Sequence, residues 1–115
     1  LANPHLRRSL ARLSVDSHLL KLKSWRALTQ ALRGGPPGPE GAATKLQWSE
    51  SHQRLLNTAI DVLGERALPG SREGVGPDAS PWVRDYLWSR AETILAGTSE
   101  VQRNIIAERM LGMPR

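Results

Sequence analysis

The chain has 115 residues, a length typical of a single domain. It contains no cysteine, which excludes disulfides and thiolate chemistry within the chain and fits a cytoplasmic protein. The net charge is +5, and arginine supplies most of the positive charge. Because these arginines are scattered and no aromatic residues alternate with them, we expect solvated helix faces and ion pairs, not nucleic-acid binding. No apolar run approaches the ~20 residues that a membrane span needs.

The first predicted element is a helix from about residue 4 to residue 33. Asn3 is a good N-cap, and Pro4 suits the first helical position. Apolar residues recur along it at roughly helical spacing: Leu6, Leu10, Leu13, Leu20, Trp25, Leu28 and Leu32. Polar residues between 14 and 17 weaken its middle, where we expect a bend. The stretch GGPPGPE, residues 34–40, ends the helix because prolines cannot continue it.

The second predicted helix runs from about residue 39 to residue 64, with Trp48 and Leu55 at the sides of its apolar face. That face contains Ala43, Leu46, Leu56, Ala59, Ile60 and Leu63. A loop rich in Gly, Pro and charge follows over residues 64–81, and loops of this length are usually functional or mobile.

Two further helices are predicted, over residues 81–95 and 99–111, and Gly112 and Pro114 end the second of them. No segment has the alternation typical of a strand. The sequence therefore predicts an all-α, up-and-down bundle of about four helices that occupies residues 1–115 as one domain. The first residues contain neither an initiator Met nor a signal peptide, so we expect the chain to begin inside a longer polypeptide or to follow processing.

The stretch ILAGTSEVQRN, residues 94–104, places a turn directly before the last helix. Two N-caps compete there: Thr98, and Ser99, which has the capping-box spacing with Gln102. Backbone N–H groups at residues 98–100 would be free and would attract an anion, and Gly97 would let a ligand approach the backbone. Most capped helix starts bind nothing, however, so this pattern alone is weak evidence for a phosphate site. Glu100 suits a ribose hydroxyl better than a bare phosphate, because a carboxylate is an acceptor.

Residues 90–115, RAETILAGTSEVQRNIIAERMLGMPR, resemble the C-terminal segment of the acyl-CoA dehydrogenase family, and residues 31–64 are similar to the preceding helix pair. Members have an N-terminal helical domain, a middle β domain and a C-terminal helical bundle, and this chain resembles most of that bundle only. The resemblance implies FAD-dependent α,β-dehydrogenation of an acyl-CoA thioester, with an electron-transfer flavoprotein as acceptor. It also implies assembly with identical or different subunits, as a dimer or a tetramer.

The resemblance assigns cofactor contacts to Thr98, Ser99 and Glu100, in a family whose FAD lies at a subunit interface. A second contact in the family comes from a Gln-x-x-Gly-Gly run, of which this chain retains only Gly64 in the stretch DVLGE, residues 61–65. Acidic residues replace the Gln and the second Gly there, and they would repel a pyrophosphate unless shielded.

Ala96 stands where many members have the Glu that removes the substrate proton, and Ala cannot act as a base. No catalytic side chain is therefore expected in this chain, although Ala96 and Gly97 would line the substrate end of the site and the Ala96 amide could polarise the thioester carbonyl. Two interpretations remain open. The base lies elsewhere in the parent protein, or the chain belongs to a non-catalytic subunit that pairs with another dehydrogenase subunit.

The remaining candidate residues favour structural roles. His5, His18 and His52 lack metal-ligand spacing, so we expect no metal site and place them at the surface or an interface. The four tryptophans are expected in the bundle core and interfaces: Trp25, Trp48, Trp82 and Trp88. A structural or assembly module is the main alternative to an enzyme domain, and a small basic nucleic-acid binder ranks last because it depends only on charge.

Overall fold

The computed structural model describes residues 3–34, 38–67 and 81–114. The first helix, α1 (Pro4–Leu32), begins where predicted, because the Asn3 side chain accepts hydrogen bonds from the backbone N–H groups of His5 (2.9 Å) and Leu6 (3.4 Å). The helix runs without a break through residues 14–17, where a bend was expected. Its polar middle instead faces the next helix, where Asp16 pairs with Arg54 at 2.9 Å.

The second helix, α2 (Glu40–Leu63), closely matches its predicted range and continues into a short 3-10 helix, η1 (Gly64–Ala67). The rest of the predicted loop lies outside the described residues. Helix α3 (Pro81–Glu92) ends three residues earlier than predicted, because a turn begins there, and α4 (Ser99–Met110) ends one residue early. The described residues contain four α-helices and no strand, so the all-α prediction is confirmed.

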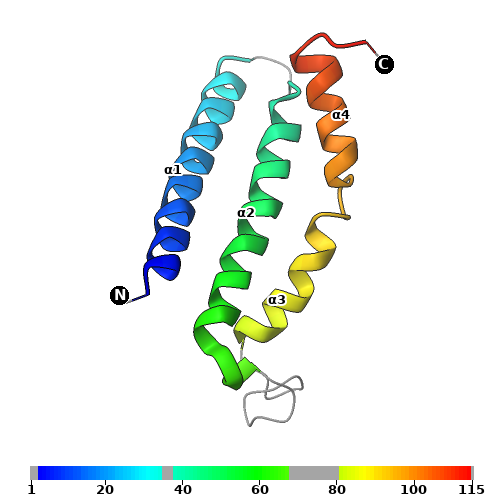
Figure 1. Cartoon of the computed structure of the whole chain (residues 1–115). Helices are drawn as coiled ribbons and strands as arrows, with labels where there is room; N and C mark the ends of the chain where they lie inside the picture. Colours follow the sequence, from blue (N-terminus) through cyan, green and yellow to red (C-terminus); the bar gives the residue numbers. More distant parts are fainter. Residues whose placement is uncertain (1–2, 35–37, 68–80, 115) are drawn as a thin grey trace.

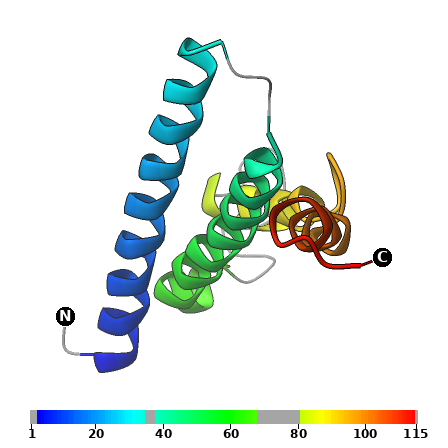
Figure 2. The same ribbon diagram turned by 90° about the horizontal axis from the view of Figure 1, so that it is seen from above.

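Helix α2 is the central element, and it packs against α1, α3 and α4. Helix α1 runs antiparallel to it on one side, while α3 and α4 follow one another along the other side (Figure 1). The view from above shows α2 between α1 and the α3–α4 pair (Figure 2). The turn that joins α3 to α4 therefore lies beside the middle of α2. Among the described residues, no helix is long and apolar enough to cross a bilayer.

The hydrophobic core of the described residues is small. Its buried apolar side chains are Ala42, Leu56 and Val83, of which Leu56 is only 1% exposed. The expected burial of the tryptophans in the bundle core is wrong, since Trp25, Trp48, Trp82 and Trp88 are all exposed by at least 42%. Many other large apolar side chains are also exposed, and an apolar surface of this extent is typical of a protein that packs against further structure.

Candidate functional site

The turn between α3 and α4 has a backbone conformation that restricts its residues. Ala96 has φ 54° and Gly97 has φ 89°, so two successive residues occupy the left-handed region. A Cβ atom on Gly97 would lie 2.6 Å from Nε2 of Gln102. Position 97 therefore needs glycine for its φ angle and for space, whereas Ala96 accepts its conformation at some cost in strain.

Side chains of α2 and α4 hold this turn in place. Lys45 Nζ donates to the carbonyl oxygen of Gly97 at 2.6 Å, and Gln53 Nε2 donates to the hydroxyl oxygen of Thr93 at 3.1 Å. Gln102 Nε2 donates to the carbonyl oxygen of Ala96 at 2.9 Å. Lys45 and Gln53 are not among the residues predicted from the sequence. Their only signal there is that they are polar residues beside the apolar face of the second helix.

Thr98 is the N-cap of α4, so the competition between the two caps is resolved. Its hydroxyl oxygen accepts from the backbone N–H of Val101 at 3.3 Å. The expected free N–H at Ser99 is wrong, because that group donates to the carbonyl oxygen of Thr93 at 3.0 Å. The capping box with Gln102 is also wrong, since the Gln102 side chain holds the turn instead.

Glu100 supplies a negative charge at the start of α4. Its carboxylate accepts hydrogen bonds from its own backbone N–H and from the Thr98 hydroxyl, and these two bonds lower the pKa of Glu100. The positive charges of Arg103 and Lys45 add to the lowering. The exposed carboxylate is therefore ionised at neutral pH and occupies part of the positive end of the helix dipole.

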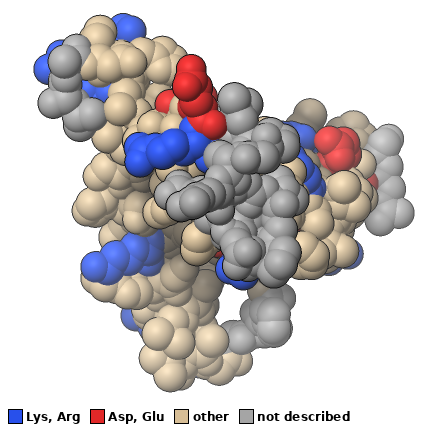
Figure 3. Space-filling model, turned by 90° about the horizontal axis from the view of Figure 1, so that it is seen from below, with Lys and Arg blue, Asp and Glu red and all other residues tan. Residues whose placement is uncertain are grey.

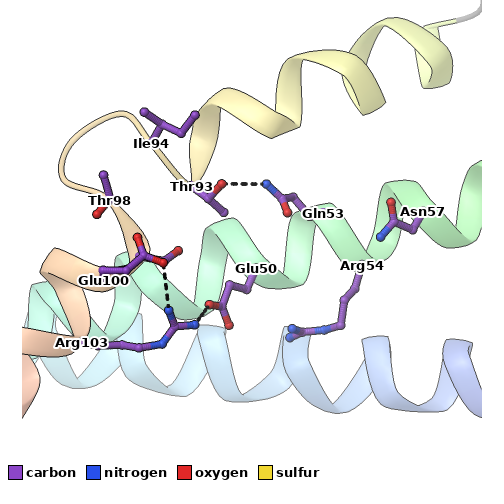
Figure 4. Close-up of a pocket in the computed structure, with 10 residues that line it drawn as sticks. Glu50, Gln53, Arg54, Asn57, Thr93, Ile94, Thr98, Glu100 and Arg103 are labelled. Atoms are coloured by element: carbon purple, nitrogen blue, oxygen red, sulfur yellow. Dashed lines mark hydrogen bonds and ion pairs between the residues drawn. The ribbon is translucent and has the colours of Figure 1, made fainter.

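A groove of about 570 Å³ lies between α2 and this turn (Figure 4). Helix α2 contributes Glu50, Gln53, Arg54 and Asn57, and the other wall comprises Thr93, Ile94, Thr98, Ser99, Glu100 and Arg103. In Figure 4, Arg103 bridges the two walls, because it pairs with Glu50 on one side and with Glu100 on the other. The groove is therefore polar and is lined by both positively and negatively charged side chains.

Ser99 is the most informative residue of the groove. It is only 7% exposed, and its Oγ atom is buried without a hydrogen-bond partner. A buried hydroxyl without a partner costs about 1–3 kcal/mol, and native structures contain few of them. The side-chain oxygen Oε1 of Gln47 is likewise buried without a partner.

The predicted site residues do not all meet at this groove. Thr98, Ser99 and Glu100 line it, and Ala96 and Gly97 form the adjoining turn. Gly64 follows the last residue of α2 and does not line the groove; at 1.5 Å per residue it is about 21 Å along the helix from Glu50 and about 10 Å from Asn57, the groove residue nearest to it in sequence. The contact of Gly64 with a cofactor stays a prediction.

Two further expectations concern metal ions and charge. The described residues contain no cluster of three or more His, Cys, Asp or Glu side chains that could hold a metal ion. On the face seen in Figure 3, Lys and Arg side chains lie at separate positions and do not form one patch. The absence of nucleic-acid binding stays a prediction.

The fold and the turn define a known class of protein. Residues 1–111 match the family model described as "Acyl-CoA dehydrogenase, C-terminal domain". The chain therefore belongs to the acyl-CoA dehydrogenase family.

Individual relatives agree with this assignment. The chain is 42% identical over 98 residues to acyl-CoA dehydrogenase IpdE1 of Mycobacterium tuberculosis, a match covering 82% of this chain and 24% of the relative. It is 40% identical over 113 residues to acyl-CoA dehydrogenase IpdE1 of Mycolicibacterium smegmatis, covering 89% of this chain and 27% of the relative. A solved structure described as "Tcur3481-Tcur3483 steroid ACAD" is similar over 100% of this chain and 30% of its own, with 28% identity and a TM-score of 0.77. This chain thus spans about a quarter of the length of its curated relatives.

Proposed function

We propose that this chain is the C-terminal domain of an FAD-dependent acyl-CoA dehydrogenase, and that its groove contacts the nucleotide part of the flavin cofactor. The observation that carries the proposal is the buried Ser99 hydroxyl, which has no partner and lies in the wall of a polar groove at a helix N-terminus. Membership of the acyl-CoA dehydrogenase family supports FAD as the ligand.

The residues at the start of α4 suit different parts of a nucleotide. The chain's own atoms cover Ser99 Oγ, so it would donate to a phosphate or ribose oxygen after a local shift that exposes it. Glu100 is ionised, so it would repel a phosphate and accept instead from a ribose hydroxyl. Thr98 holds the Glu100 carboxylate in position through its hydroxyl. The start of α4 would therefore offer one donor and one acceptor to a sugar–phosphate unit.

The turn itself would lie at the substrate end of the site. FAD supplies a hydride acceptor when it is bound, and an acyl-CoA thioester is the proposed donor. Ala96 and Gly97 would present backbone to the thioester, where an N–H group can polarise the carbonyl oxygen. Ala96 has no proton-accepting group, so the base must come from a segment outside this chain. An electron-transfer flavoprotein is the proposed acceptor of the electrons.

Gly64 is assigned to the same cofactor through the family resemblance, in which FAD lies at a subunit interface. The proposed assembly is therefore a dimer or tetramer of identical or different subunits. Asp61 and Glu65 flank Gly64 and are exposed, so they would weaken a contact with a pyrophosphate.

The test uses the full-length protein that contains this chain. We expect this protein to purify with FAD and to lose its flavin absorbance when an acyl-CoA is added anaerobically. A steroid acyl-CoA should be tried first, because one similar solved structure is described as a steroid ACAD. The variant Ser99→Ala should weaken FAD binding about 3–10-fold, the equivalent of one hydrogen bond. The matched control is Ser24→Ala, which removes an exposed hydroxyl on α1 that bonds only to its own helix. A full-length protein that contains no flavin and binds none would refute the proposal.

A structural or assembly module is the second candidate, because so many apolar side chains are exposed and the Gly64 region is acidic. In that case the chain would pair with another dehydrogenase subunit and bind no FAD. An antibody against the C-terminal peptide would show the mass of the native protein in its source cells. A mass near the 12.7 kDa of this chain would favour the module, and a mass several times larger would favour the enzyme domain.

A further inference from the structure

Lys45 is a half-buried cation of α2 that forms no ion pair within the described part of the chain. Its ammonium group donates instead to the carbonyl oxygen of Gly97 at 2.6 Å, a contact that spans 52 positions of the sequence. Removing a charge from water costs free energy, which proteins usually compensate with an opposite charge. Here one backbone carbonyl of the turn takes that place, so the contact asks for a reason beyond packing.

The neighbouring peptide of the turn is held in the same way. Nε2 of Gln102, a residue only 7% exposed, donates to the carbonyl oxygen of Ala96 at 2.9 Å. The peptides are trans, so the N–H group of each points opposite to the C=O group of the same peptide. The N–H groups of Gly97 and Thr98 are therefore directed away from the two side chains that hold the carbonyl oxygens.

Both N–H groups are available to a ligand. Neither donates a hydrogen bond to any group of the described residues, whereas the N–H of Ser99 is already engaged by the Thr93 carbonyl oxygen. Ala96 is exposed, and Gly97 and Thr98 are half-buried, so the turn is partly open to solvent. The turn therefore offers two N–H donors of fixed direction just before α4.

The charge of Lys45 also changes the peptide that it holds. A hydrogen bond from an ammonium group is stronger than one from a neutral donor, and hydrogen bonds in series polarise one another. The N–H of Thr98 belongs to the same peptide as the Gly97 carbonyl, so it becomes a stronger donor. Such a donor stabilises an oxygen atom on which negative charge develops.

We propose that Lys45 is a positioning residue for the dehydrogenation: through the Gly97 carbonyl it directs and polarises the Thr98 N–H, which donates to the carbonyl oxygen of the acyl-CoA thioester. This inference rests on the proposed function, in which the turn lies at the substrate end of the site. Loss of the proton beside the carbonyl carbon moves negative charge onto that oxygen, so the hydrogen bond strengthens as the reaction proceeds. Gln102 orients the Gly97 N–H in the same way but adds no charge.

The test is the rate of anaerobic flavin reduction by an acyl-CoA in the full-length protein. Lys45→Met should retain FAD and reduce it about 10–100-fold more slowly, because the donor remains but is misdirected and less polarised. The affinity for the acyl-CoA should change less than about threefold, since the lost stabilisation belongs to the transition state. Lys45→Arg keeps a cationic donor and should recover most of the rate. The matched control is Lys21→Met, which removes an exposed ammonium of α1 that lies over the Trp25 ring, and its rate should be that of the wild type.

Infrared difference spectroscopy adds a readout that a merely structural role would not move. The bound enoyl-CoA product, isotopically labelled at its thioester carbonyl carbon, should show a carbonyl stretch at lower wavenumber in the wild type than in Lys45→Met. A hydrogen bond to the oxygen weakens the C=O bond, which explains this direction. If Lys45→Met does not retain FAD, Lys45→Gln replaces it, because Gln keeps a donor without the charge, and its stretch should also lie above that of the wild type.

The outcomes separate this inference from the proposed function. A wild-type rate and carbonyl stretch in Lys45→Met, a wild-type stretch in Lys45→Gln, or equal losses of rate in Lys45→Met and Lys45→Arg would overturn the role of Lys45. A full-length wild-type protein that contains no flavin, or whose flavin no acyl-CoA reduces, would refute the proposed function itself.

Discussion

The substitution Gly97→Ala measures how strongly the turn depends on its glycine. Two costs add at this position. An alanine at φ 89° is strained by about 1–2 kcal/mol. Its Cβ would also lie 2.6 Å from Gln102 Nε2, so the buried Gln102 must move and release the Ala96 carbonyl oxygen, which costs about 1–3 kcal/mol more. We therefore expect Gly97→Ala to lower the free energy of unfolding by about 2–5 kcal/mol.

The control separates these two costs. Gly112 also has a positive φ, of 66°, but a Cβ there would meet nothing within 4 Å. Gly112→Ala should therefore show only the conformational cost, of about 1–2 kcal/mol. Urea unfolding followed by far-UV circular dichroism gives both values. In the double variant Gly97→Ala/Gln102→Ala the steric contact is absent, so the two single effects should not add. Equal losses for Gly97→Ala and Gly112→Ala would refute the claim that the contact with Gln102 matters.

Three other predictions follow from the contacts of the site and core. Lys45→Met removes a donor to the turn, so amides of residues 93–98 should exchange with deuterium several-fold faster. NMR titration should find the pKa of Glu100 below its ordinary value, and Thr98→Val should raise that pKa, because the carboxylate then loses one of its hydrogen bonds. The ionised carboxylate stabilises the fold at neutral pH, and this stabilisation disappears as the pH falls through the depressed pKa. Leu56→Ala should cost about 2–5 kcal/mol by urea unfolding, whereas Leu55→Ala, at 39% exposure, should cost about 1 kcal/mol or less.

Local signals predicted the helices well. The start of α1 depends only on Asn3 and Pro4, and both lie beside the helix that they begin. Prolines and glycines between α1 and α2 likewise ended the first helix within one or two residues of its predicted end. Such boundaries follow from backbone chemistry within one turn, so the sequence contains what is needed to place them.

Contacts between distant residues explain what the sequence analysis missed. The choice of Thr98 over Ser99 as N-cap depends on the Thr93 carbonyl oxygen, which takes the Ser99 N–H once the turn has formed. That turn is held by Lys45, far away in the sequence. His52 and Glu92 are separated by 40 positions, and nothing in either neighbourhood indicates their pairing. The ligand contacts at residues 98–100 stay a prediction, and the residues that position this turn were not predicted.

Helix α2 is the central helix, and its neighbours on the two sides are held to it by different kinds of contact. Helix α1 has no buried residue and packs on α2 alone among its main contacts, whereas α3 and α4 are tied to α2 by hydrogen bonds to the turn. Loss of α1 would leave those hydrogen bonds intact but would remove Asp16, the ion-pair partner of Arg54, which lines the groove beside the turn. One ion pair therefore couples the first helix to the candidate site. A substitution at Asp16 would act on the docking of α1 and on the position of the Arg54 side chain in the groove at the same time.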